Sequence, residues 1–122
     1  TYRIETWRRT ATPGWVAEGG DLQLSAQGRF SFGALTAAPP NTQLVLAQPT
    51  ECLDDDDVAV AGTSCVIFNS RGIPVSSSGA PVTTQTVYLR GPSGVFAVVV
   101  GGTGQQQVWR SNVVAGGVWT QQ

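Results

Sequence analysis

The chain has 122 residues, with seven Arg or Lys and eight Asp or Glu, so its net charge is −1 at pH 7. All seven bases are arginines, and the sequence contains no lysine, histidine or methionine. These absences exclude a Ser-His-Asp triad, a histidine general base and a lysine Schiff base within this chain. The carboxylates Glu18 and Asp21, the alternative acid–base pair, lie in a Gly-rich turn without recognisable catalytic context. We therefore expect a protein that is not an enzyme.

The charges are distributed unevenly along the chain. The segment 1–57 holds all eight acids and four arginines, whereas the segment 58–122 holds three arginines and no acid. Only 12% of the residues are charged, while 41% are hydrophobic. A chain of this length and composition can bury one core, and no linker or internal repeat divides it. We therefore expect a single domain over residues 1–122.

Extended segments dominate the sequence, and no stretch shows sustained helical periodicity. The 15 glycines and seven prolines break the chain repeatedly. We expect strands over residues 21–26, 29–33, 43–47, 64–68, 86–90, 95–100 and 105–110, while residues 2–7 are either a first strand or the end of a longer helix. The segment 74–81 is expected to be a loop, and the segment 113–122 to be a last edge strand or an exposed segment that adds to a partner's sheet.

The last three expected strands are joined by short Gly-rich turns at residues 91–94 and 101–104. Such connections are too short for parallel crossovers, so these strands form an antiparallel meander. The expected fold class is mostly β, a single domain of antiparallel strands. Alternation on the last strand places Trp109 and Arg110 on opposite faces.

The two cysteines, Cys52 and Cys65, lie close together in a loop-rich stretch. We expect them to form a disulfide, which would stabilise the fold by roughly 3 kcal/mol and would place the protein in an oxidising compartment. The alternative is a pair of buried free thiols. A metal site is not expected, because the chain has no other cysteine and no histidine.

The segment from Cys65 to Pro74 (CVIFNSRGIP), with Gly79 after it, resembles the C-terminal half of the GspH/FimT group of pseudopilins and minor type IV pilins. In that family a short strand runs into a Phe-Asn/Asp-x-x-Gly turn, a loop with a second glycine follows, and a β-meander ends the domain. The likeness extends over residues 64–111, a little under half the chain.

The resemblance implies a soluble head domain whose N-terminal helix would precede Thr1. That helix would carry a prepilin peptidase site and anchor the full-length protein in the bacterial inner membrane. The head would lie in the periplasm or in a cell-surface filament. It would be a non-catalytic subunit of a type IV pilus or type II secretion pseudopilus, docking to other minor pilins to prime or cap the filament. The alternatives are a minor pilin that binds DNA for uptake and a surface adhesin.

The run of four acids, Asp54, Asp55, Asp56 and Asp57, is the most conspicuous local feature. Clustered carboxylates are ligands for Ca²⁺, but the run lacks the alternating spacing and the glycine of an EF-hand loop. We expect a solvated loop and no cofactor, with calcium as the alternative.

The candidate residues for contact with DNA or a partner are Arg71, Arg90, Trp109 and Arg110. Arginines contact phosphates and a tryptophan can stack on a base. However, Gly104 to Gln107 (GQQQ) stands where a DNA-binding relative would carry arginines, so contact with a neighbouring subunit is preferred. Trp15, Trp109 and Trp119 are expected to pack in the core or on the sheet, with an exposed sugar-binding row as the alternative.

Overall fold

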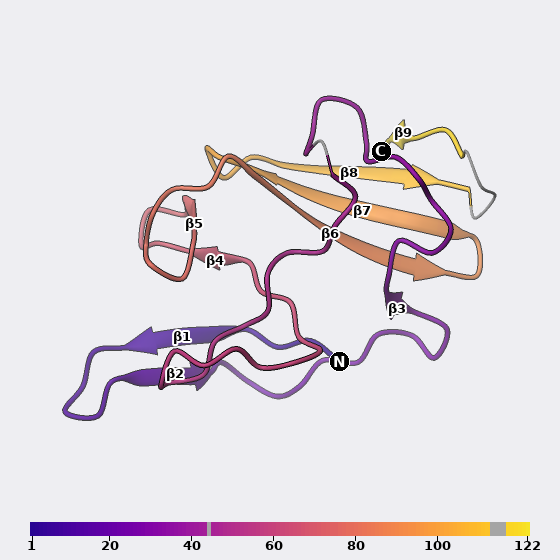
Figure 1. Ribbon diagram of the computed structural model, residues 1–122. Coiled ribbons are helices and arrows are strands. Elements are labelled where there is room, and N and C mark those ends of the chain that lie inside the picture. The colour runs from indigo at the N-terminus through magenta and orange to yellow at the C-terminus, as the bar shows by residue number, and fades with distance from the viewer. Residues whose placement is uncertain (44, 113–116) are drawn as a thin grey trace.

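A computed structural model describes residues 1–43, 45–112 and 117–122, and within these ranges the chain forms strands and no helix (Figure 1). The mostly-β, antiparallel class expected from the sequence is confirmed. The strands are β1 (Glu5–Arg8), β2 (Gly14–Ala17), β3 (Arg29–Phe30), β4 (Ile67–Phe68), β5 (Pro74–Val75), β6 (Thr84–Gly91), β7 (Gly94–Gly101), β8 (Gln106–Ser111) and β9 (Thr120–Gln121).

The largest sheet has five strands in the order β3-β6-β7-β8-β9. Its centre is the predicted meander of β6, β7 and β8, whose neighbours are all antiparallel and lie side by side in Figure 1. The β6–β7 turn closes with Gly91 opposite Gly94, and Gly94 adopts a φ of 142°. The β7–β8 turn closes through Gly101 and Gly104, and Gly104 adopts a φ of 82°. Glycine is the residue that reaches these angles without steric cost.

The two faces of this sheet differ in burial. Along the register, Tyr88 pairs with Ala97 and Ala97 pairs with Trp109, so these three share one face, the inner face. Tyr88 and Ala97 are fully buried there, together with Val95. Leu35 completes this core, with Phe32, Leu46, Trp109 and Trp119 packed around it.

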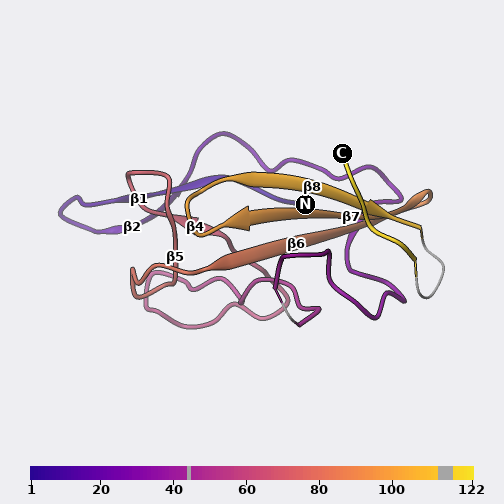
Figure 2. The ribbon, with the colours of Figure 1, turned by 90° about the horizontal axis from the view of Figure 1, so that it is seen from above.

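Aromatic contacts close the inner face. The ring of Tyr88 lies 5.8 Å from that of Phe32 and 6.2 Å from that of Trp119. The indole of Trp119 donates a hydrogen bond of 2.9 Å to the carbonyl of Ala37. Trp119 thus joins the end of the chain to the segment after β3, which runs along one side of the meander in Figure 2. Within the described residues 117–122 the tail packs as an edge strand, while residues 113–116 of that prediction lie outside the described ranges.

Two separate hairpins complete the fold. In the β1–β2 hairpin, Trp7 and Trp15 are register partners and their rings meet edge-on at 5.3 Å. The sequence Pro13-Gly14 indicates a turn, and β2 was not predicted after it. In the structure Gly14 is the first residue of β2 and pairs with Arg8. The β4–β5 hairpin contains Pro74 and Val75, which were expected in a loop.

The turn between β4 and β5 is the Phe-Asn-x-x-Gly segment noted in the sequence. The side chain of Asn69 accepts hydrogen bonds from the amides of Arg71 at 2.9 Å and Ile73 at 3.1 Å. Gly72 has a φ of 75° and donates to the carbonyl of Asn69 at 3.0 Å. The asparagine side chain thus accepts hydrogen bonds from the turn backbone, and the glycine supplies a positive φ. These properties make both residues common in turns.

Two expected strands do not form in the described residues. The segment 21–26 makes only an isolated bridge, Leu22 to Tyr2. In the segment 43–47, of which residue 44 lies outside the described ranges, Gln43 instead donates its side-chain amide to the carbonyls of Val45 and Ala47. Just beyond it the Gln48 side chain bonds both the amide and the carbonyl of Tyr88, at 3.0 and 2.9 Å. A side-chain amide thus takes the place of strand pairing at this edge of β6.

Candidate docking surface

The outer face of the five-stranded sheet carries apolar side chains that are not fully covered. The register places Phe30 opposite Leu89 and Leu89 opposite Phe96, which sets them on the face away from Tyr88. Phe30 is 42% exposed and Val108, on the same face, is 39% exposed. We call this the outer face; its apolar residues in the described chain are Phe30, Val87, Leu89, Phe96, Val98, Val100 and Val108, of which only Val100 is buried.

An open groove of about 890 Å³ borders this face. The sheet contributes Phe30 and Val87 to its lining, and the N-terminal part of the chain contributes Tyr2 and Trp15. Most of the remaining wall comes from the loop closed by the two cysteines, within the segments 52–55 and 60–65. The outer face and the groove therefore form one continuous region in which aromatic and aliphatic side chains reach solvent.

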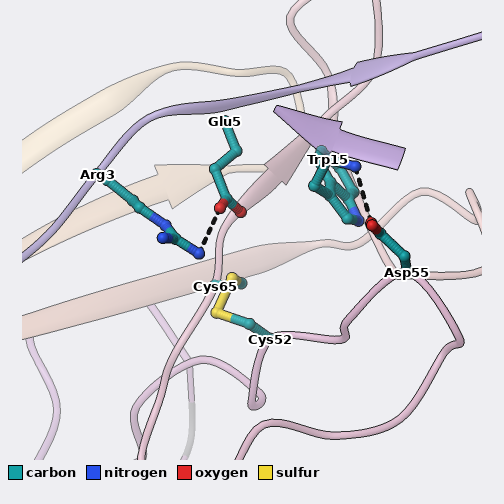
Figure 3. Close-up of polar contacts among 6 residues, drawn as sticks. All are labelled: Arg3, Glu5, Trp15, Cys52, Asp55 and Cys65. Carbon is teal, nitrogen blue, oxygen red and sulfur yellow. Dashed lines mark hydrogen bonds and ion pairs between the residues drawn. A yellow bond between two sulfur atoms is a disulfide. The ribbon is translucent and has the colours of Figure 1, made fainter. Parts of the chain in front are cut away.

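The wall of the groove is held by a disulfide. Cys52 and Cys65 are bonded, with their Cα atoms 5.0 Å apart, as the sequence predicted. A hydrogen bond of 2.9 Å, from the Trp15 amide to Oδ1 of Asp55, ties the loop to the β1–β2 hairpin (Figure 3). Nearby, Arg3 and Glu5 form an ion pair at 2.6 Å. The disulfide thus closes the loop covalently, and the carboxylate of Asp55 holds the loop to the neighbouring β1–β2 hairpin.

The four consecutive acids have two different roles in this loop. Oδ1 of Asp54 accepts hydrogen bonds from the amides of Asp56 and Val58, and Asp55 accepts from Trp15. The carboxylates of Asp56 and Asp57 accept no hydrogen bond from the described residues and are exposed. Over the described ranges no three acidic, cysteine or histidine side chains come close enough together to hold a metal ion. Calcium binding stays an untested alternative.

The structure does not bring the four candidate contact residues together. Arg90 pairs with Val95 on the inner face, whereas Arg110 pairs with Phe96 on the outer face. Trp109 packs against the core instead of lying free beside them. Arg71 lies in the β4–β5 turn, which contacts the β7–β8 turn through Gly72 and Gly104. That places Arg71 at the opposite end of the meander from Arg90, about 25 Å away along the length of β7.

Arg110 belongs to the rim of the outer face. Its guanidinium lies 5.7 Å from the centre of the Phe96 ring and donates a hydrogen bond of 3.2 Å to the carbonyl of Ser93. A cation over an aromatic face is attracted by the ring electrons. Arg110 therefore shields one side of Phe96 while leaving a positive charge at the border of the apolar surface.

One residue that the sequence did not single out is Arg29. It is the direct register partner of Arg90 across β3 and β6. The two arginines lie in distant parts of the chain, so no local signal could have identified their pairing.

The pKa of Tyr88, a core residue, is shifted by its surroundings. Burial raises the pKa of the Tyr88 hydroxyl above its usual 10.0, partly offset by hydrogen bonding.

No protein-family model, curated protein or solved structure matches the chain. The described residues contain no helix that is long and apolar enough to cross a membrane.

Proposed function

We propose that the chain is a non-catalytic head domain that docks to other subunits of a pilus or secretion pseudopilus. The observation that carries this proposal is the outer face, where the side chains of Phe30 and Val108 reach solvent among other apolar residues. A contiguous apolar surface of this kind is characteristic of protein–protein contact sites. The order of strand, Asn-x-x-Gly turn and meander that resembles the minor pilins supplies the kind of partner.

Two further features support an assembly role over catalysis. The chain has no histidine or lysine, so the commonest acid–base and covalent mechanisms have no residue to use. The Cys52–Cys65 disulfide suits a protein that works in the periplasm or on the cell surface. In this proposal the domain acts by burying its outer face and the neighbouring groove against a partner subunit.

The test is a pull-down of the minor pilins from the same organism with the wild-type chain and with Val108→Asp. Val108 is a 39% exposed apolar residue of the outer face, so an added charge should abolish docking while leaving the domain folded. Gln105→Asp is the matched control, because it adds the same charge at an exposed polar position directly before β8, where alternation places its side chain on the other face of the sheet. Thermal melting verifies that both variants fold. Capture of pilins by Val108→Asp at wild-type levels, or a wild-type chain that captures none, contradicts the proposal.

A further inference from the structure

The pairing of Arg29 with Arg90 sets two like charges directly opposite each other on neighbouring strands. Cross-strand partners of the same charge destabilise a sheet. Elsewhere in the described chain ion pairs join Arg3 to Glu5 and Arg8 to Glu18, and neither of them involves this pair. The charge of the pair is therefore not compensated by any of the described residues.

The stem of Arg90 packs beside Gly33, in the segment after β3. Its side chain crosses Gly33, where a Cβ atom would lie only 3.3 Å from Cδ of Arg90. Gly33 has a φ of 61°, and its amide is held by the hydroxyl of Ser31 at 3.0 Å. The stem of Arg90 thus lies against the segment after β3 while the residue stays exposed. Because the guanidinium is a planar fork, arginine loses less conformational entropy for each hydrogen bond that it forms with a carboxylate.

The complementary charge is presented elsewhere on the same molecule. Asp56 and Asp57 are exposed at the tip of the disulfide loop, and their carboxylates are not used to hold it. The loop itself is closed by the disulfide, by the Leu53–Ala59 bridge and by the amide of Asp54 bonding the carbonyl of Val58. Two carboxylates that make no hydrogen bond to the described residues therefore lie on a well-supported loop.

These two charged groups do not meet within one chain. Arg90 leaves the sheet on the inner face, whereas the disulfide loop walls the groove beside the outer face. No ion pair joins them in the described residues. We propose that Arg29 and Arg90 form a carboxylate-binding site whose occupant is Asp56 and Asp57 of a second copy of this chain.

Such a contact is heterologous, because different surfaces of the two copies meet. Heterologous contacts build rings or open chains of subunits instead of closed dimers. Planar guanidinium groups bind carboxylates in two-pronged geometry, which gives the contact direction as well as attraction. The inference uses surfaces other than the outer face and does not depend on the function proposed above.

The experiment is sedimentation velocity of the whole chain as protein concentration rises, at about 0.01 M and about 1 M salt, where the Debye length is about 30 Å and about 3 Å. The wild type should associate at low salt and dissociate at high salt. The double variants Arg29→Glu/Arg90→Glu and Asp56→Arg/Asp57→Arg should each associate at least about tenfold more weakly, since like charges then face each other. Mixing the two variants should restore association, because contacts that join like charges in each variant alone join opposite charges in the mixture.

The matched control is Arg9→Glu/Arg71→Glu, which makes the same change in net charge at two exposed arginines outside the site. It should associate like the wild type. A wild type that stays monomeric at low salt, an Arg29→Glu/Arg90→Glu variant that associates normally, or a mixture that fails to recover would each overturn the inference. A wild type that binds duplex DNA without associating with itself, together with loss of that binding in Arg29→Glu/Arg90→Glu, would overturn the inference in favour of a phosphate ligand.

Discussion

The backbone amide of Trp15 donates a 2.9 Å hydrogen bond to Asp55, forty residues further along the chain. The same carboxylate occupies the space beside Gly14, where a Cβ atom would lie 2.9 Å from Oδ2 of Asp55. One side chain of the acidic run therefore joins the disulfide loop to the β1–β2 hairpin. Trp15 and Asp55 both line the groove beside the outer face.

Asp55→Ala should lower the free energy of unfolding by about 1 kcal/mol, because the Trp15 amide loses a charged acceptor. Urea denaturation monitored by tryptophan fluorescence measures this change. Asp56→Ala is the control, since its carboxylate accepts no hydrogen bond from the described residues, and it should change stability by less than about 0.5 kcal/mol. Equal effects of the two substitutions would contradict the assigned role of Asp55.

Gly104→Ala should lower the free energy of unfolding by about 2 kcal/mol or more. Gly104 has a φ of 82°, which alanine adopts only with strain, and its added methyl group would meet the carbonyl oxygen of Gly72. The turn of the β4–β5 hairpin and the turn of the meander would have to separate. Gly20→Ala has open space and should be nearly neutral. Thermal melts of both variants compare them, and a stable Gly104→Ala protein would argue against this contact.

Arg29→Glu should stabilise the protein by about 0.2–1 kcal/mol, because it replaces a like-charged cross-strand pair with an opposite one. Arg29→Gln, which only removes the repulsion, should give a smaller gain. Chemical denaturation at low salt measures both, and high salt should reduce the difference between them. A destabilised Arg29→Glu variant would mean that Arg29 and Arg90 are not register partners.

Stability should fall as the pH rises above the usual tyrosine pKa of 10.0. Burial raises the pKa of Tyr88, so the native state keeps its phenolic proton to higher pH than the unfolded state does. Between 10.0 and the raised pKa, unfolding releases a proton, and the free energy of unfolding decreases with pH. Ultraviolet absorbance of the phenolate in a Tyr2→Phe variant isolates Tyr88. Ionisation of Tyr88 at its usual pKa without loss of near-ultraviolet circular dichroism would contradict its burial.

Replacing both cysteines, Cys52→Ala with Cys65→Ala, should lower the free energy of unfolding by about 3 kcal/mol, because the unfolded chain then regains the entropy of the open loop. Reduction of the wild type should have a similar effect. Intact mass with and without reductant checks that the native protein contains the disulfide. Two free thiols in the native protein would remove the argument for an oxidising compartment.

The meander and the disulfide could be predicted because their signals are local. The β-rich run at 95–100, bounded by Gly-rich turns, determines β7 and its neighbours without reference to the rest of the chain. A single pair of cysteines allows a single disulfide within the chain. The prediction that Trp109 and Arg110 lie on opposite faces follows from strand geometry and is confirmed by their register.

The segments 21–26 and 43–47 also alternate, yet they form no strand in the described residues. Pairing requires a free neighbouring edge, and at β6 the Gln48 side chain and the short strand β3 occupy that edge. The β1–β2 pairing was not predicted, because the glycine that indicates a turn after β1 is itself the first residue of β2. Trp7 and Trp15 are register partners across this turn.

The sequence by itself determined the fold class, the meander, the cysteine pair and the absence of histidine and lysine chemistry. Only the tertiary structure decided which sheet face is buried, that Arg29 faces Arg90, and that Asp55 reaches Trp15. Turn residues and side-chain alternation act over a few neighbouring residues, and they can be read along the chain. Contacts between segments that are distant in the chain depend on how all the elements pack together, so they appear only once the chain is folded.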